Sequence, residues 1–415
     1  MNELRPRWLE PLLHRALRSM PVVVVTGARQ TGKTTLAQAV APERRYLTLD
    51  DLDVLAQAGR DPASLLAELP VTLDEVQRAP ELLLAVKRRV DTARKPGSLL
   101  LTGSANLALM HRVAESLAGR ALYLDLPPFC PVEWSGRDAA STGIDRLFAG
   151  RFSSDDWPAE PCDWPAWVAC GGFPDALRAP DAAARELWFA GYVQTYLERD
   201  LRQLSNVGSL VDFQRLMRLL AAQTARVLNQ SNLARDAGLP QPTAHRYLNL
   251  LETGCQIARL RNYQRSAGKA AAKARKILWR DAGLAAWLAG VGAEKNLADR
   301  PDAGFWLEQA VFQTLQSWAA LDPTRRIHFW REGDAEVDFV LEQAGVLVGL
   351  EIKAARRAAE EDLRGVRAFQ AAFARKGRRP RAVVLHTGTE ARFLGDEAWS
   401  LGLGVWLPRR AADRI

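Results

Sequence analysis

The chain has 415 residues, of which 48% are hydrophobic and 25% are charged. This is the composition of a globular protein and excludes a disordered or fibrous one. Because domains usually contain about 100–200 residues, the length predicts roughly two to four domains. The formal net charge of +8 and the pI near 9.5 favour anionic partners, nucleic acid in particular.

Cysteine content and hydropathy indicate a compartment. The four cysteines, Cys130, Cys162, Cys170 and Cys255, form no CxxC pair. Their number and spacing exclude a disulfide framework and a zinc knuckle, and are typical of a reducing cytoplasm. The first residues lack an uninterrupted apolar core and a cleavage site, and no apolar run approaches the roughly 20 residues that span a bilayer. We therefore expect a cytoplasmic protein with no membrane partner.

The first motif follows a predicted helix over residues 4–20. Four valines, Val22 to Val25, predict a short buried strand, and the next segment, GARQTGKT, matches G-x-x-x-x-G-K-[ST] without a mismatch. Glycines let the backbone wrap around phosphates, and N–H groups at the start of the next helix point at the anion. Lys33 would contact the β- and γ-phosphates, and the Thr34 hydroxyl would ligate Mg²⁺. The predicted ATP-binding residues are Gly27, Ala28, Arg29, Gln30, Thr31, Gly32, Lys33, Thr34 and Thr35.

Two acids end another predicted strand of this segment. A helix from Lys33 to about Val40, a strand over 46–50 and a short helix over 64–69 precede the strand PVTLDE at 70–75. An apolar strand that ends in two acids is the pattern of a Walker B motif. Asp74 would hold Mg²⁺ through its waters, and Glu75 would orient and deprotonate the attacking water.

The strand over 98–102 runs into Gly-Ser-Ala-Asn. A polar residue at its tip would lie beside the γ-phosphate as a sensor, and Ser104 and Asn106 both qualify. A helix over 107–117 and a strand over 121–125 continue an alternation that predicts a doubly wound α/β core. Arg120 stands before the last strand, where an oligomeric ATPase presents an arginine finger to its neighbour. The alternative is a solvated surface arginine.

Residues 127–163 mix proline, glycine, serine and tryptophan, which predicts loops and a short helical insertion. The segment from 182 to 204 predicts a long helix, which we expect to cover the nucleotide site as a lid.

The segment 206–290 has the pattern of a DNA-binding module. Residues 231–252 have the periodicity of a helix–turn–helix with Gly238 in the turn. The outward residues of its second helix would be Gln241, Thr243, His245 and Arg246. The basic stretch from Arg259 to Arg280 contains no acidic residue and predicts a wing that contacts phosphates, with Arg265, Lys269 and Lys273 in it. The alternative is a winged helix that serves only as a packing module.

A second constellation lies near the C-terminus. A predicted helix over 306–318 carries Glu308, and paired strands over 335–341 and 346–353 carry Asp338, Glu351 and Lys353. Period-two alternation places Glu351 and Lys353 on one face. Asp338 and Glu351 would share a Mg²⁺ ion, with Glu308 as a further ligand and Lys353 beside the attacking water, as phosphodiester cleavage requires. The alternative is a set of buried acids paired with Lys353. A helix over 358–373, a strand over 381–386 and a last strand near 405–407 complete this α/β segment.

Eight segments, taken together, resemble a known family: VVVVTGARQTGKTTL, VTLDEVQ, LLLTGSAN, ESLAGR, GGFPDAL, YVQTYLERDL, LARDAGLPQPTAHRYLNLLE and the final E…VDFVL…LEIK. The chain is similar to bacterial and archaeal AAA-type P-loop ATPases whose C-terminal domain of unknown function has a restriction-endonuclease-like core. The resemblance implies an AAA+ core over 1–135, an insertion and helical lid over 136–205, a winged helix over 206–290 and an endonuclease-like α/β domain over 291–415. It implies ATP and Mg²⁺ as cofactors.

Three functions are compatible with this pattern. The first is an ATP-driven homo-oligomer, expected as a hexameric ring, that binds DNA, branched DNA included, and remodels or translocates it. The second is a nucleotide-dependent regulatory switch whose C-terminal domain makes protein contacts. The third is a metal-dependent DNA nuclease that the ATPase gates.

Overall fold

The structure, a computed structural model, describes residues 4–104, 117–149, 152–195, 209–264, 275–291, 297–374 and 379–410. Two compact units make up the chain. The first comprises Met1–Pro128 and Asn249–Gln256, and the second comprises Phe129–Leu248 and Ile257–Ile415. The finer division into four segments stays a prediction.

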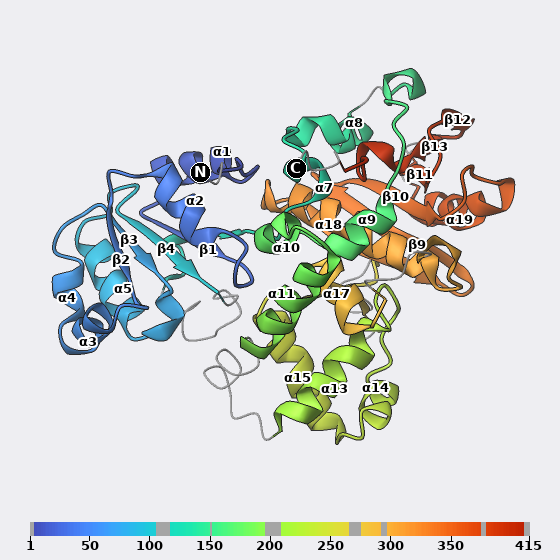
Figure 1. The fold of residues 1–415 in the computed structure, drawn as a ribbon. Coiled ribbons are helices and arrows are strands. Elements are labelled where there is room, and N and C mark those ends of the chain that lie inside the picture. The colour runs from blue at the N-terminus through green and yellow to red at the C-terminus, as the bar shows by residue number, and fades with distance from the viewer. Residues whose placement is uncertain are drawn as a thin grey trace. The chain divides into compact units, whose positions relative to one another are not determined.

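A five-stranded sheet, with strand order β2-β3-β4-β1-β5, forms the centre of the first unit (Figure 1). All neighbouring strands are parallel. Val22 to Val25 are fully buried, as a parallel strand covered on both faces requires. The predicted α/β class is thus confirmed for this unit. The strands are β1 (Val22–Thr26), β2 (Arg45–Thr48), β3 (Val71–Asp74), β4 (Leu99–Gly103) and β5 (Ala121–Asp125).

Helices cover both faces of this sheet. Side chains of α3, α4 and α5 share one apolar core with Val22, Val24 and Leu101, whereas α1 and α2 contact β1 and β4. Helix α3 was not predicted, although Asp51 caps it by accepting hydrogen bonds from the N–H groups of Asp53 and Val54. The helices are α1 (Glu10–Ser19), α2 (Lys33–Val40), α3 (Leu52–Arg60), α4 (Pro62–Leu65) and α5 (Leu82–Thr92).

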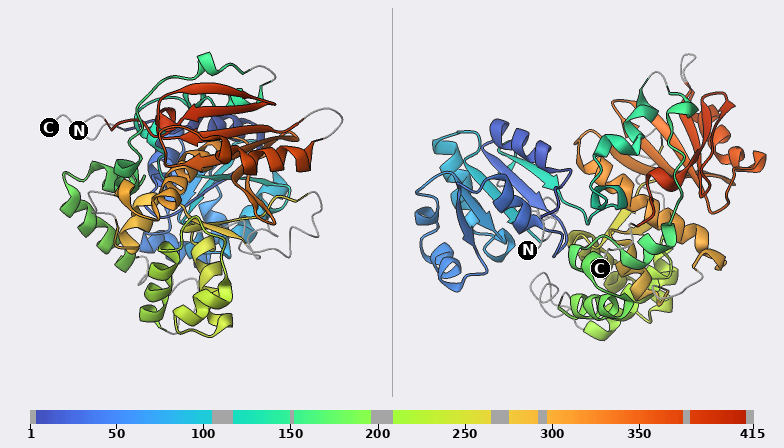
Figure 2. Two further views of the ribbon diagram at one scale, coloured as in Figure 1. Left: turned by 90° about the vertical axis from the view of Figure 1, so that its right-hand side faces the viewer. Right: turned by 45° about the horizontal axis from the view of Figure 1, so that its top comes forward.

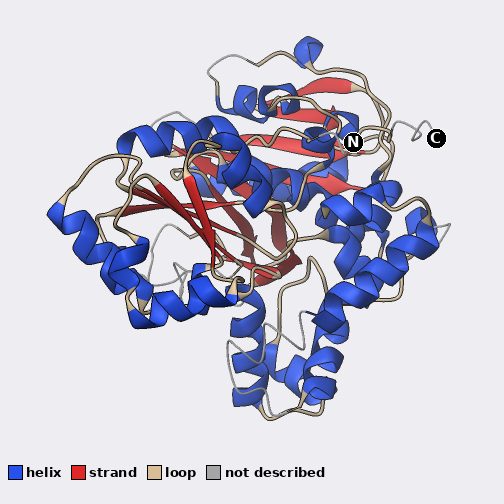
Figure 3. Ribbon diagram, turned by 60° about the vertical axis from the view of Figure 1, so that its left-hand side comes forward, coloured by secondary structure: helices blue, strands red, loops and turns tan. Residues whose placement is uncertain are grey.

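The second unit contains a six-stranded mixed sheet in the order β12-β13-β11-β10-β9-β8. β10 pairs in parallel with β11, and β11 with β13, while the other pairs are antiparallel. Helices border the strands of this sheet as they do in the first unit (Figure 3). The strands are β8 (Arg326–Glu332), β9 (Ala335–Gln343), β10 (Val346–Lys353), β11 (Arg381–His386), β12 (Ala391–Gly395) and β13 (Ala398–Gly402).

Two helices pack against this sheet. Val366 and Phe369 of α19 (Leu363–Phe373) share a buried core with Val340 and Val384. The long helix α18 (Ala303–Ala320) contacts β8 and β10, and its Phe312 stacks on Phe339 of β9 with ring centroids 6.3 Å apart. In the part of the chain that the structure describes, no helix is both long enough and apolar enough to cross a membrane.

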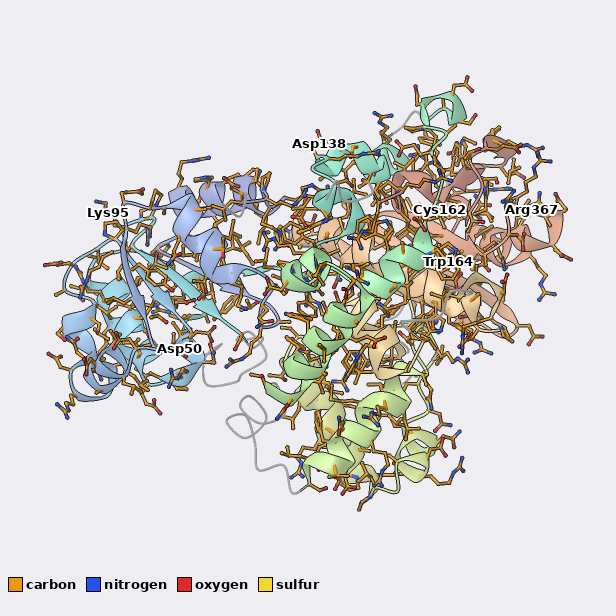
Figure 4. The ribbon with its side chains drawn as sticks, viewed as in Figure 1. Asp50, Lys95, Asp138, Cys162, Trp164 and Arg367 are labelled. Atoms are coloured by element: carbon orange, nitrogen blue, oxygen red, sulfur yellow. The ribbon has the colours of Figure 1, made fainter. Side chains whose placement is uncertain are left out.

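The tryptophan-rich segment, residues 134–167, packs on the C-terminal strands. The indole N–H of Trp157 donates to the Gly402 carbonyl at 2.9 Å, and that of Trp406 donates to the Thr142 carbonyl at 2.7 Å. Figure 2 shows the teal stretch around α8 beside the red strands in both views, and Figure 4 labels Cys162 and Trp164 at the start of α9. This segment therefore belongs to the core of the second unit. Its helices are α7 (Pro131–Trp134), α8 (Ile144–Phe148) and α9 (Trp164–Cys170).

The predicted helix–turn–helix consists of α14 and α15, with Gly238 between them at φ +64°. Leu233, Tyr247 and Leu251 are buried, and Phe213 of α13 contacts the ring of Tyr247. An antiparallel strand pair follows. The remaining elements are α10 (Pro174–Arg178), α11 (Ala182–Thr195), α13 (Leu210–Ala221), α14 (Gln230–Asp236), α15 (Gln241–Thr253), β6 (Ile257–Leu260), β7 (Lys276–Trp279) and α17 (Ala282–Leu288).

The structure departs from the predicted helices and strands at two places. The predicted strand near 405–407 is wrong, because a 3-10 helix occupies Leu403–Val405. The indole N–H of the following Trp406 donates to the Thr142 carbonyl. Strand β8 was not predicted. Most of the helix expected over 107–117 and the end of the helix expected over 182–204 lie outside the described residues.

Candidate nucleotide site and C-terminal charged centre

The phosphate-binding loop has the backbone that its glycines permit. Gly27 has a φ of +150°, and a Cβ atom there would collide with the Leu126 carbonyl oxygen. Gly32 adopts a left-handed conformation directly before α2. Both positions thus require glycine. Arg7 fixes the loop from outside, because its guanidinium donates to the carbonyls of Thr31 at 2.6 Å and Pro127 at 2.7 Å. The sequence pattern gave no signal for Arg7.

Lys33 is buried within this loop. Its Nζ donates to the carbonyl oxygens of Ala28 at 2.6 Å and Gly27 at 3.1 Å. Burial lowers the pKa of Lys33, and the nearby Glu75 carboxylate opposes that shift. The other loop residues surround it: Thr31 is buried and donates to the Ala28 carbonyl at 3.0 Å, while Gln30 and Thr35 are exposed.

The Asp74 carboxylate, at the carboxyl end of β3, accepts hydrogen bonds from three hydroxyl groups. The Thr34 hydroxyl donates to Asp74 Oδ2 at 3.0 Å, the Tyr46 hydroxyl donates to the same oxygen at 2.6 Å, and Thr102 donates to Oδ1. Tyr46 and Thr102 reach Asp74 from the two strands that flank β3, which lies between β2 and β4. Thr34 approaches from the first turn of α2. Burial and the bond to Asp74 raise the pKa of Tyr46. The sequence analysis missed Tyr46 and Thr102.

These oxygen atoms fit the predicted Mg²⁺ and nucleotide. Mg²⁺ prefers oxygen ligands, one or two of them carboxylates, together with substrate phosphates. Thr34 and Asp74 present a hydroxyl and a carboxylate within hydrogen-bond distance of each other, next to the helix N-terminus that would bind phosphate.

Gln77 connects the predicted general base to one predicted sensor. Its amide Nε2 donates to the Glu75 carboxylate and, at 2.9 Å, to the Ser104 hydroxyl, and its Oε1 accepts from the Ser104 N–H at 3.3 Å. Glu75 itself has a left-handed backbone with φ +59°. The structure thus brings Ser104 to Glu75, while Asn106 lies outside the described residues. Gln77, two residues after Glu75, was not predicted.

Arg120 lies away from the phosphate-binding loop of its own chain. It directly precedes β5, whose start pairs with the start of β1, whereas the loop follows the end of β1. The guanidinium makes a two-pronged ion pair with Asp91 of α5, at 2.6 and 3.0 Å. A role for Arg120 at a neighbouring subunit stays a prediction.

The predicted DNA-contacting residues of the helix–turn–helix lie on α15. Gln241, His245 and Arg246 are exposed, and Thr243 is half-buried. The His245 ring nitrogen Nδ1 lies 3.3 Å from Gln230 Oε1, and Arg246 lies over the Tyr247 ring. The three wing residues, Arg265, Lys269 and Lys273, lie outside the described residues.

A buried lysine stands at the C-terminal charged centre. Lys276 of β7 has a side chain that is 1% exposed, and its Nζ makes ion pairs with Glu308 of α18 and, at 3.2 Å, with Asp338 of β9. Burial alone would lower the pKa of Lys276, but the two carboxylates raise it overall. Asp338 also accepts a hydrogen bond from the Ile352 N–H at 2.8 Å. Lys276 belongs to the basic stretch that was predicted to form the wing.

Glu351 and Lys353 form the other half of this centre. Lys353 Nζ lies 2.9 Å from Glu351 Oε1 and 3.5 Å from Asp362. Burial and the Asp338 charge raise the pKa of Glu351 to about 8. Within the described ranges, no three histidine, cysteine, aspartate or glutamate residues are grouped so that they could hold a metal ion. The residues present therefore do not fit the predicted Mg²⁺ at Glu308, Asp338 and Glu351, because the Lys276 ammonium lies between the first two.

Comparison with family models matches three parts of the chain. An AAA domain matches residues 19–134, a domain of unknown function (DUF8612) matches 163–295, and a second (DUF4143) matches 303–404. The AAA match confirms the predicted AAA-type domain.

Relatives and solved structures also match. The chain is 33% identical to "Uncharacterized protein Rv2008c" of Mycobacterium tuberculosis over 347 residues, which is 82% of this chain and 72% of that protein. The Mycobacterium bovis protein Mb2031c gives the same values. Among solved structures, the Walker-type ATPase PABY2304 of Pyrococcus abyssi is 18% identical with a TM-score of 0.42, covering 69% of this chain and 99% of that one. The Thermotoga maritima RuvB Holliday junction branch migration motor is 20% identical with a TM-score of 0.26, covering 60% and 88%. The chain therefore belongs to the same protein family as the two mycobacterial proteins, with an AAA domain at residues 19–134.

Proposed function

We propose that this protein binds ATP with Mg²⁺, hydrolyses the nucleotide, and uses the cycle to bind and remodel or translocate DNA as a homo-oligomer. The observation that carries the ATPase part is the Thr34–Asp74 pair, 3.0 Å apart, at the N-terminus of the helix that begins with the buried Lys33. A hydroxyl and a carboxylate in that place suit a metal-bound triphosphate.

Each residue of this site has a distinct task. Lys33 would exchange its bonds to the loop carbonyls for bonds to the phosphates, where its positive charge offsets the charge of the transferred group. The Mg²⁺ ion, when bound, would neutralise charge on the phosphate oxygens. Glu75 would accept the proton of the attacking water. Tyr46 and Thr102 hold the Asp74 carboxylate in one orientation.

The DNA part of the proposal rests on α14, α15 and the β6–β7 pair. A short helix, a turn at Gly238 and a second helix with exposed Gln241, His245 and Arg246 present polar side chains in the way that a recognition helix does. The net charge of +8 favours binding to phosphate backbones.

Two assays of the full chain test the proposal. Phosphate release should fall about 100-fold or more in Lys33→Ala, which should also lose ATP affinity. Glu75→Gln should lose about 100-fold in turnover yet keep ATP bound, because only the proton acceptor is lost. Wild-type turnover in Glu75→Gln would contradict the role of Glu75. Fluorescence anisotropy with single-stranded, duplex and four-way-junction DNA tests the second part, and binding to none of them would contradict it.

A nucleotide-dependent switch is the second candidate, and one observation favours it. The Gln77 amide donates a hydrogen bond to the Glu75 carboxylate, and this bond restrains the proposed general base. A switch would show slow turnover that is indifferent to DNA, whereas a motor would turn over faster with DNA. The third function, a metal-dependent nuclease gated by the ATPase, is disfavoured because the Lys276 ammonium forms ion pairs with two of the predicted metal ligands.

A further inference from the structure

We infer that the Lys276 ammonium replaces a divalent cation at the C-terminal carboxylate centre, so that this centre is a metal-independent clasp between the β6–β7 pair and the C-terminal sheet. The inference goes beyond the proposed function, because it concerns the second unit and does not depend on ATP hydrolysis.

The geometry of the three charged groups supports the replacement. Lys276, Glu308 and Asp338 come from β7, α18 and β9, and their side chains are 1%, 9% and 11% exposed. A buried carboxylate that carries its charge is stabilised by a paired cation, and here the ammonium contacts both of them. The Lys276 Nζ also lies 5.4 Å from the centre of the Phe339 ring, so an aromatic face covers part of the remaining surface of the charge.

Each oxygen atom of the Asp338 carboxylate has a partner in the structure. One oxygen faces Lys276, and the other accepts the backbone N–H of Ile352 at 2.8 Å. Glu351, on the same strand as Ile352, turns Oε1 to Lys353 instead. A divalent ion bound to Asp338 would compete with the Lys276 ammonium for the same carboxylate.

A ladder of glutamines holds β7 in place beside this ion cluster. Gln309, Gln313 and Gln316 follow each other at intervals of four and three residues on α18, a spacing that places them on one side of the helix. Figure 1 labels α18. Gln309 bonds both the N–H and the carbonyl of Trp279, at 3.0 and 2.8 Å. Gln313 accepts from the Ala282 N–H, and Gln316 donates to the Arg280 carbonyl.

The ladder continues the contact that Glu308 begins. Because Glu308 directly precedes Gln309, four polar residues of one helix bind the stretch from 276 to 282. The backbone that follows Lys276 is therefore held against α18 by hydrogen bonds that do not involve the ammonium group.

The test is a thermal melt of the full chain across a Mn²⁺ titration without nucleotide, in an Asp74→Asn background that removes the metal-binding carboxylate of the first unit. The variants are Lys276→Met, Lys276→Met with Glu308→Gln, and the control Lys353→Met, which removes a more exposed lysine of the same centre. Mn²⁺ bound per chain is counted in parallel by electron paramagnetic resonance.

We expect the unaltered centre to show no Mn²⁺-dependent rise in Tm. Lys276→Met should melt lower than Lys353→Met, because it leaves two carboxylates buried without their cation. Mn²⁺ should then raise its Tm and bind once per chain, and the added Glu308→Gln should abolish both effects.

Two results would overturn the inference. One is a Mn²⁺-dependent rise in Tm of the chain that retains Lys276, together with its loss in Asp338→Asn. The other is a Lys276→Met chain that binds no more Mn²⁺ than its parent. If Lys276→Met does not fold, the chain that retains Lys276 is assayed for DNA cleavage and for bound Mn²⁺. DNA cleavage that requires Mn²⁺ and disappears in Asp338→Asn would contradict the inference. No such cleavage, together with no bound Mn²⁺, would support it.

Discussion

Gln77 is the residue through which the nucleotide site differs most from what its motifs alone would suggest. Its side chain contacts Glu75 and Ser104 together, so the proton acceptor and the candidate sensor form one hydrogen-bonded unit. While Gln77 donates to the Glu75 carboxylate, that carboxylate is less available to a water molecule. We interpret the contact as a restraint on the basal reaction.

Replacing Gln77 by alanine should therefore raise basal ATP turnover. Since a hydrogen bond to a charged group contributes about 1.5–3 kcal/mol, we expect a rise of about 10-fold to 100-fold, with ATP affinity unchanged. Steady-state phosphate release and nucleotide titration measure the two effects. Gln57→Ala, which removes an exposed amide from α3, is the matched control. A fall in turnover would show that Gln77 aligns Glu75 for catalysis instead of restraining it.

Glu351 should make the stability of the chain depend on pH. Its pKa is raised from its ordinary 4.5 to about 8, first by burial and then by Asp338. The folded chain thus keeps the proton to a higher pH than the unfolded chain, so the stabilisation is complete below about pH 4.5 and is lost as the pH rises towards 8. The charged groups around this carboxyl group are Asp338, Lys276, Lys353, Glu308 and Asp362.

Urea unfolding between pH 5 and 8 measures this effect. The free energy of unfolding of the wild type should fall relative to that of Glu351→Gln by at most about 1.4 kcal/mol per pH unit. The comparison uses the change with pH, because the variant also changes the contact with Lys353, which gives an offset that does not depend on the Glu351 proton. Parallel curves for the two proteins would contradict the raised pKa.

At the scale of elements, strands and helices with strong periodicity were predictable. The valines of β1, the phosphate-binding loop and the helix from Lys33 to Val40 lie where local sequence places them. The residues that meet at Asp74 were only partly predictable, because Tyr46 and Thr102 belong to neighbouring strands and their approach depends on strand order. Lys276 shows the same limit more strongly, since its partners lie 32 and 62 residues further along the chain.

The predicted wing is the element whose function is most open to test. Neutralising Arg265, Lys269 and Lys273 together should weaken binding about equally for all DNA sequences, because phosphate contacts carry no base information. The slope of log affinity against log salt should become less steep by about 0.9 for each lost contact to duplex DNA. Anisotropy at several salt concentrations measures it. An unchanged slope would place these residues away from DNA.

For the whole molecule, the proposed homo-oligomer would place residues of more than one chain at each active site. Arg120 lies at the opposite end of the strands from its own phosphate-binding loop, so any part it takes in hydrolysis must be at the site of a neighbouring subunit. Its ion pair with Asp91 is exposed to solvent, and such pairs contribute little to stability. Arg120→Ala should therefore fold normally.

Mixing Arg120→Ala with Lys33→Ala chains tests this arrangement. Each variant alone should be inactive, whereas the mixture should regain a measurable fraction of wild-type turnover, because each chain supplies the group that the other lacks. Arg88→Ala, which removes another exposed arginine from α5, should stay active by itself. A protein that remains monomeric by light scattering with and without ATP would exclude catalysis in trans.

We propose above all that the protein couples ATP hydrolysis to DNA. The most direct test is the steady-state rate of phosphate release by the full chain with and without saturating DNA, supplied as single-stranded, duplex or four-way-junction DNA, with Lys33→Ala as the blank. The account predicts a rate that at least one of these DNAs raises about 10-fold, against no rate in Lys33→Ala. A wild-type rate that is the same with every DNA and without DNA would contradict it.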